Sequence, residues 1–144
     1  MKNTAMSTVM TKKNNERAVH LFDARGKVLG RLATEIAKVL SGRDKVDFVP
    51  HIDGGDVVIV INAADIVATG RKMQQKTYHR FSGYPGGITS ITLKDQLKKD
   101  ARKVIENAVF GMLPKNKLRA KMMKRLYIYN DAQHAHTNVT VTHA

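Results

Sequence analysis

Residues 57–61 read VVIVI, a continuous run of β-branched side chains, with the turn-like DGGD before it and NAADI after it. A strand that is covered on both faces has this composition, because neither of its faces meets water. Gly and Asp mark the preceding turn and limit the strand to these positions. The stretch therefore predicts a buried strand of a parallel sheet in an α/β protein.

The segments before this strand supply a second strand and a helix. Residues 18–24, AVHLFDA, are a short apolar run that ends at a turn. Residues 27–42 carry apolar side chains at helical spacing, with Gly42 as the expected stop and Gly30 inside the helix. We expect Gly30 to permit close packing of this helix on the sheet.

The segments after it continue the α/β pattern. Residues 76–88 begin as a strand or arm and become a Gly-rich loop, and residues 92–113 predict two helical pieces. Thr92 and Asp95 form a capping pair for the first piece, and Pro114 ends the second. A basic helix over residues 115–126 and a strand over 126–129 follow. We predict one α/β domain over residues 18–130 with a mainly parallel sheet, a flexible extension over 1–17 and a tail over 131–144.

The charge of the chain indicates a polyanionic partner. Its 144 residues include 25 Lys and Arg against 12 Asp and Glu, a net charge of +13, and no Cys. Nucleic acid, an anionic membrane or an acidic protein is attracted by such a field. Leu, Ile, Val and Phe make up a quarter of the chain, which is enough for a folded core. Disulfides and thiolate zinc sites are excluded, and no run is long enough to span a membrane.

The basic charge is concentrated near the C-terminal end of the predicted domain. Residues 101–125 contain eight Lys or Arg and one acidic residue, Glu106. A solvated helix face normally mixes charges of both signs, so an anionic partner is favoured. Leu118, Met122 and Leu126 form only a narrow apolar stripe without aromatics. A helix on a membrane surface is the competing interpretation, but the apolar side of such a helix should be broad and rich in Trp, Phe or Leu. RNA or DNA phosphates are therefore the preferred partner.

A glycine-rich aromatic segment is the second candidate for nucleic-acid binding. Residues 77–87 place aromatic rings beside His79 and Arg80 and among three glycines. Such a composition suits stacking on unpaired bases and close contact with the sugar-phosphate backbone. The alternative is a surface loop whose aromatic rings fold back on the core, and the sequence favours neither.

The sequence gives little support for a catalytic or cofactor-binding site. Residues 23–33 combine a Gly turn with a helix start, but they match neither common phosphate-binding fingerprint. His51, Asp53 and Asp56 fit turn formation better than catalysis or metal binding. The tail residues His134, His136 and His143 are interpreted as ordinary polar residues. A nucleotide-dependent enzyme is kept as the rival from another class.

Several of these segments, taken together and in order, resemble the ribosomal protein L13 family of bacterial or organellar type. They are DARGKVLGRLATEIAKVLSG (23–42), HIDGGDVVIVINA (51–63), ATGRK (68–72), YHRFSGYPGGI (78–88) and GMLP (111–114) before the basic segment. The resemblance implies a three-layer α/β/α fold with a four-stranded parallel sheet. It also implies a non-catalytic structural protein of the large ribosomal subunit that binds rRNA and enters assembly early. Phe110 departs from the basic residue usual before GMLP.

The expected partners are large-subunit rRNA and neighbouring large-subunit proteins, with no cofactor, metal, membrane or homo-oligomer. Binding of its own mRNA, which occurs in some family members, is a further partner for which the sequence offers no test. The expected location is the cytoplasmic ribosome, with an organellar ribosome as the alternative. The predicted RNA-binding residues are Arg25, Lys27, Arg31, Arg43, Lys45, Arg71, Lys72, Lys76, Tyr78, His79, Arg80, Phe81, Gly83, Tyr84, Gly86, Gly87, Lys115, Lys117, Arg119, Lys121, Lys124 and Arg125.

Overall fold

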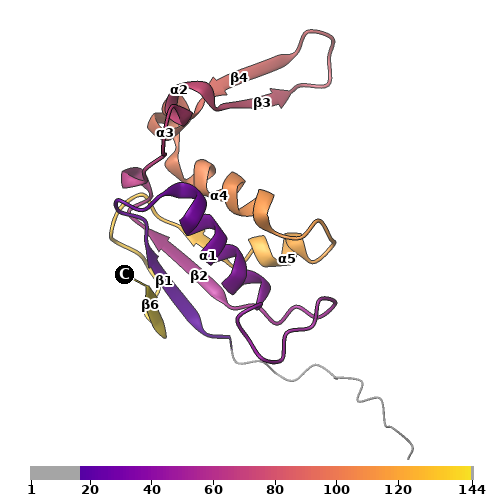
Figure 1. The fold of residues 1–144 in the computed structure, drawn as a ribbon, viewed down its shortest axis with the longest axis vertical. Helices are drawn as coiled ribbons and strands as arrows, with labels where there is room; N and C mark the ends of the chain where they lie inside the picture. The colour runs from indigo at the N-terminus through magenta and orange to yellow at the C-terminus, as the bar shows by residue number, and fades with distance from the viewer. Residues whose placement is uncertain (1–16, 144) are drawn as a thin grey trace, which may run out of the picture.

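A four-stranded sheet forms the centre of the protein, whose computed structural model describes residues 17–143 (Figure 1). The strands are all parallel and lie in the order β5-β2-β1-β6. They are β1 (Val19–Asp23), β2 (Val57–Ile61), β5 (Leu126–Ile128) and β6 (Val141–His143). Helices flank the sheet, so the expected α/β class with its three-layer arrangement is confirmed.

Helices α1 (Leu29–Ser41), α4 (Ala101–Met112) and α5 (Arg119–Met123) share one buried apolar cluster with the sheet. Phe22, Val58 and Val60 supply the strand side of this cluster. Successive side chains of a strand point to opposite faces, so Tyr127 of β5 points away from these helices. His136 contacts the Tyr127 ring there, with 4.6 Å between the ring centroids. The connection from β5 to β6 therefore passes across the second face of the sheet.

Helix α1 follows the predicted apolar spacing. Its Leu32, Ile36 and Leu40 side chains are buried, and Gly42 ends the helix with a φ of 77°. Gly30 lies inside the helix as predicted, but a Cβ at this position would meet no atom within 4 Å. The expected close packing at Gly30 is therefore wrong, because this side of α1 faces solvent.

An antiparallel hairpin projects away from the central sheet (Figure 1). The short elements η1 (Ala63–Asp65) and α2 (Lys72–Gln75) lead into β3 (Thr77–Phe81), which pairs with β4 (Ile88–Thr92). A strand or arm was expected from residue 76, and β3 is a strand. Strand β4 was not predicted, and it contains Ile88 from the expected loop, residues 89–91 and Thr92. Its sequence, ITSIT, runs directly into a helix cap and has no turn signal of its own.

The two helical pieces predicted over residues 92–113 are α3 (Leu93–Lys99) and α4. The Thr92 hydroxyl accepts a hydrogen bond from the Asp95 N–H at 3.3 Å, and it donates to the Asp95 carboxylate at 2.6 Å. The predicted capping pair is therefore confirmed. Helix α4 ends at Met112, two residues before Pro114, as expected.

The end of the chain contributes a strand. Residues 131–144 were expected to form a tail, but Val141–His143 pair in parallel with β1. The His143 ring stacks on Phe22, with 4.2 Å between the centroids and 9° between the planes. His143 is therefore part of the packed fold and differs from the polar tail residue that was expected. The expected extension over residues 1–17 lies outside the described residues except for Arg17.

Candidate nucleic-acid interface

Five cations between α4 and β5 form a group that we call the basic segment. Four of its side chains are exposed and Arg119 is half-buried. Among the ion pairs formed by residues 17–143, none involves a member of this group. A charge cluster without acidic partners within the chain is suited to an anionic partner. The members of the basic segment are Lys115, Lys117, Arg119, Lys121 and Lys124.

The helix in this region is shorter than predicted. It covers only the five residues Arg119–Met123 and begins without a side-chain cap at Leu118. In the turn before the helix, the Asn116 side-chain oxygen accepts the N–H of Arg119 at 3.1 Å. The Arg119 guanidinium lies 3.8 Å from the centroid of the Phe110 ring, so the aromatic residue that departs from the family pattern holds this cation in place.

The apolar stripe of the same segment faces the interior. Met122 is buried in the core cluster, and Leu118 and Leu126 pack against it. A helix that binds a membrane surface needs a free apolar face. These three side chains do not provide one, which removes the structural basis of the membrane-surface interpretation.

Arg125 differs from its neighbours, because its side chain points into the protein. Its guanidinium forms two hydrogen bonds of 2.6 Å to the Asp53 carboxylate. It also donates to the carbonyl oxygens of Leu40 at 3.1 Å and Asp56 at 3.3 Å. The expectation of an exposed phosphate ligand therefore does not fit Arg125, which holds together α1, the loop before β2 and the start of β5.

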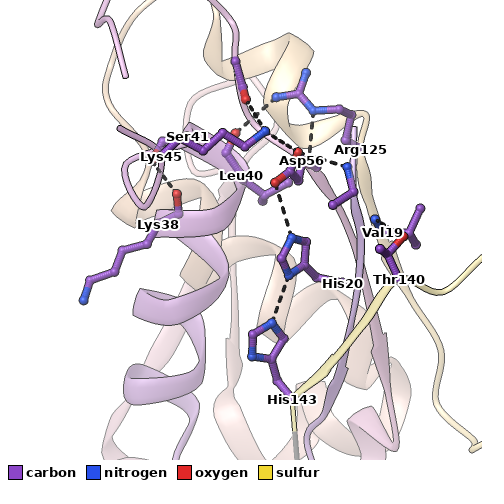
Figure 2. A network of polar contacts seen from close by, with 12 residues as sticks. Val19, His20, Lys38, Leu40, Ser41, Lys45, Asp56, Arg125, Thr140 and His143 are labelled. Atoms are coloured by element: carbon purple, nitrogen blue, oxygen red, sulfur yellow. Dashed lines mark hydrogen bonds and ion pairs between the residues drawn. The ribbon is translucent and has the colours of Figure 1, made fainter. Parts of the chain in front are cut away.

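Asp56 is the centre of a second buried polar cluster (Figure 2). Its carboxylate accepts a 2.6 Å hydrogen bond from Lys45 Nζ and lies 3.3 Å from His20 Nε2. His20 Nδ1 shares a 2.9 Å hydrogen bond with His143 Nε2. Asp53 and Asp56 were interpreted as turn formers, but they neutralise partly or fully buried cations. Lys45 is consequently held inside this cluster and is less available to RNA than predicted.

The hairpin places its predicted aromatic residues in two different environments. Tyr78 packs against the core, with its hydroxyl buried, and burial raises the pKa of that hydroxyl. Phe81 and Tyr84 are exposed at the far end. The interpretation of aromatic rings folded back on the core thus fits Tyr78 alone, while exposed rings are available at the tip.

The turn of the hairpin has a defined geometry. Gly87 donates to the Tyr84 carbonyl at 2.9 Å, and Gly86 has a φ of 73°. Pro85 and Gly86 thus occupy the two central positions of a type II turn, where proline and a positive φ are favoured. The conformation of Gly86 is explained by this turn, whether or not a partner approaches it.

Comparison with known proteins identifies the family. The family model for Ribosomal protein L13 matches residues 17–135. The chain belongs to the ribosomal protein L13 family. It is 53% identical over 121 residues to the large ribosomal subunit protein uL13 of Clostridioides difficile, covering 84% of this chain and 85% of that protein. It is 52% identical over 132 residues to uL13 of Dictyoglomus thermophilum, covering 91% and 93%.

Membership of the L13 family answers the question of enzymatic activity. L13 proteins are structural, non-enzymatic components of the ribosome, so the expectation that this chain is not an enzyme is confirmed. Across residues 17–143, no group of three or more His, Asp or Glu side chains is arranged to hold a metal ion. In the same residues, no helix is both long and apolar enough to cross a membrane.

Three further predicted cations of this L13 protein lie in the first βα turn and at the start of α1. Lys27 and Arg31 line a depression of about 760 Å³ between α1 and β6, together with Glu35 and His143. Arg25 pairs with Asp65 at 3.6 Å on the surface. These three predicted residues precede β2 and are distant in sequence from the basic segment.

The exposed cations near the hairpin include two that were not among the predicted RNA-binding residues. Arg71 and Lys72 are exposed on or beside α2, and α2 packs against α3. Lys94 and Lys98 of α3 are exposed and were not predicted as RNA ligands. The sequence did not single out these two lysines, because α3 also carries Asp95 and so mixes positive and negative side chains as a solvated helix face does.

The attachment of β6 depends on a titratable ring. Burial, followed by the charge of His20, holds the pKa of His143 below its ordinary value of 6.5. The unfolded chain then binds more protons than the folded chain as pH falls below about 6.5, so packing of β6 weakens in that direction. The charges of Glu35 and Asp44 raise the pKa of His143 and oppose this lowering, and the charge of Lys27 adds to it.

We expect hydrogen exchange of the β6 amides, corrected for intrinsic rates, to be faster at pH 5.5 than at pH 7.5. His143→Phe is the matched control, because phenylalanine retains a ring that can stack on Phe22 but binds no proton. An equal pH dependence of β6 exchange in this control would contradict the assignment to His143.

Proposed function

We propose that this protein is a structural constituent of the large ribosomal subunit and binds large-subunit rRNA chiefly through the basic segment. The observation that carries the proposal is the group of cations without acidic partners on a folded body. Its relatives are named large ribosomal subunit proteins, which supports the same role. Such contacts with phosphates position a protein on RNA without reading its sequence.

The proposed contact surface extends from the basic segment to the first βα turn, the hairpin base and the hairpin turn. Arg80 is exposed on β3, and Tyr84 at the tip provides an exposed ring for stacking on an unpaired base. Five predicted residues are left out. Arg125, Lys45 and Tyr78 are buried or engaged in contacts within the protein. The His79 ring is hydrogen-bonded to Thr77 and Ser90, and Phe81 is paired with the apolar Ile88. The proposed contacts are Arg25, Lys27, Arg31, Arg43, Arg71, Lys72, Lys76, Arg80, Gly83, Tyr84, Gly86, Gly87, Lys115, Lys117, Arg119, Lys121 and Lys124.

The proposal includes the wider setting of this contact. The protein joins the subunit early in assembly, lies beside other large-subunit proteins and acts as a monomer in cytoplasmic ribosomes. The bacterial origin of the relatives quoted above supports the cytoplasmic location. Repression of its own mRNA would use the same cations, because phosphate contacts do not distinguish one RNA from another.

The test reverses three charges of the basic segment. The triple variant Lys117→Glu, Lys121→Glu and Lys124→Glu is expected to bind large-subunit rRNA more weakly in filter binding. Its salt slope is expected to fall by roughly 0.7–0.9 per lost phosphate contact. The melting temperature is expected to change little, because these side chains are exposed and form no ion pair within the described part of the chain.

The matched control makes the same charge change in the N-terminal extension, at Lys2, Lys12 and Lys13. Both triple variants have the same net charge, so the comparison separates the position of the cations from their number. The proposal fails if the variant of the basic segment keeps the wild-type affinity and slope. It also fails if the control loses as much affinity as that variant.

A further inference from the structure

The hairpin has two chemically different faces. Directly opposed residues of an antiparallel pair lie on the same face, and consecutive residues alternate between faces. Phe81 is opposite Ile88, and His79 is opposite Ser90 on that same face. Arg80, opposite Thr89, lies on the other face. We call the face of Phe81, Ile88, His79 and Ser90 the apolar face, and the other the arginine face.

The outer part of the apolar face exposes a large hydrocarbon surface. Phe81 and Ile88 are each 64% exposed and lie side by side as a cross-strand pair. Exposed contiguous apolar side chains rimmed by polar groups mark protein interaction sites.

The distribution of charge argues against phosphate at this face. The chain has a net charge of +13, yet the paired residues of this face include no Lys, Arg, Asp or Glu; they are Thr77, His79, Phe81, Ile88, Ser90 and Thr92. RNA and DNA interfaces are polar and strongly positive. Phenylalanine can stack on a base, but the branched Ile88 beside it has no flat surface to offer. An uncharged apolar partner matches this pair better than a nucleic acid.

The apolar face is also held in a defined shape before any partner arrives. Five cross-strand pairs connect β3 and β4. His79 is hydrogen-bonded to Thr77 at 3.0 Å and to Ser90 at 2.7 Å, so the polar groups of this face satisfy one another. A pre-ordered surface loses little conformational entropy when it binds.

We infer that Phe81 and Ile88 bind an uncharged apolar patch on a neighbouring large-subunit protein, while the arginine face contacts rRNA. The inference rests on the proposed function, because it places the chain in the large subunit. It reassigns Phe81 and His79, which were predicted to bind RNA, to a protein-facing surface. The hairpin then lies between RNA on one side and protein on the other.

A photo-crosslinking pair tests the two faces within assembled large subunits. A benzoylphenylalanine residue replaces Ile88 in one protein and Thr89 in the matched control, which differs by one position and one face. After irradiation, the Ile88 probe is expected to yield an adduct with a large-subunit protein that mass spectrometry identifies. The Thr89 probe is expected to yield RNA adducts. An RNA adduct at position 88, or none at all, overturns the inference.

A binding experiment separates this inference from the proposed function. The variant Phe81→Thr with Ile88→Thr places a β-branched residue, which suits a strand, at both positions and removes the apolar surface. It is expected to bind protein-free rRNA with the wild-type affinity and salt slope. Large subunits are then reconstituted with the other large-subunit proteins, and the variant competes with the wild-type protein for incorporation. The incorporated fraction of the variant is expected to fall about tenfold or more relative to wild type.

The control Arg80→Thr changes the opposite face and is expected to weaken binding to protein-free rRNA. The double threonine variant could lose binding to protein-free rRNA as strongly as it loses incorporation in the presence of the other proteins. This result would mean that the apolar face contacts RNA, and it overturns the inference. Unchanged incorporation of that variant also overturns it. If the wild-type protein itself fails to bind protein-free rRNA, the proposed function fails instead.

Discussion

Arg125→Ala is expected to lower the free energy of unfolding by about 3–5 kcal/mol, the usual result of removing one partner from a buried ion pair. The substitution leaves the Asp53 carboxylate without the two 2.6 Å hydrogen bonds that it accepts from the guanidinium. It also removes a donor from the buried Leu40 carbonyl at the end of α1. Urea unfolding followed by circular dichroism measures the change.

The matched control for Arg125 is Lys121→Ala, one helical turn earlier and exposed. A surface substitution of this kind changes stability by no more than about 0.5 kcal/mol. The double variant Arg125→Ala with Asp53→Ala is expected to lose less than the sum of the two single changes, because neither charge is then left unpaired. A loss below about 1 kcal/mol in Arg125→Ala would exclude the role of a buried clamp.

Gly55→Ala is expected to destabilise the protein by about 1–3 kcal/mol or more, the range of overpacked cores. A Cβ at Gly55 would overlap the Leu40 carbonyl oxygen, would lie 2.5 Å from its carbonyl carbon and would come within 3.0 Å of Arg125 Nη2. Backbone atoms cannot rotate away as a side chain does, so the loop before β2 must move away from the end of α1.

Gly30→Ala provides the contrasting control. The same added methyl group meets no atom within 4 Å, and the position lies inside α1. Alanine in a helix interior is favoured over glycine by about 0.5–1 kcal/mol. We therefore expect a raised melting temperature for Gly30→Ala and a lowered one for Gly55→Ala. Equal melting temperatures for the two variants would contradict the close approach at Gly55.

Local sequence patterns predicted the elements whose own residues determine them. The β-branched run became β2, the helical spacing became α1, and the Thr92 cap starts α3. Each signal is contained within a few neighbouring residues. The family resemblance supplied the four-stranded parallel sheet, which the local patterns alone did not define.

The features that were missed depend on partners distant in sequence. Arg125 and Lys124 are adjacent cations in one basic run, and nothing local distinguishes them. Asp53, which holds Arg125 inside, lies 72 positions away. Strand β6 has only three residues with weak alternation, and its position comes from pairing with β1. The two faces of the hairpin became visible only when β4 was paired with β3.

The pairing of β6 with β1 has a consequence for synthesis of the chain. His20 and His143 are 123 positions apart, yet they share a hydrogen bond across this pair of strands. Residues 19–128 can bring β1, β2 and β5 together first, but the outer edge of β1 then exposes unpaired N–H and C=O groups, which attract strands from other molecules. A nascent chain arrested before residue 141 leaves that edge open, so stalled or truncated products are expected to aggregate where the finished protein does not.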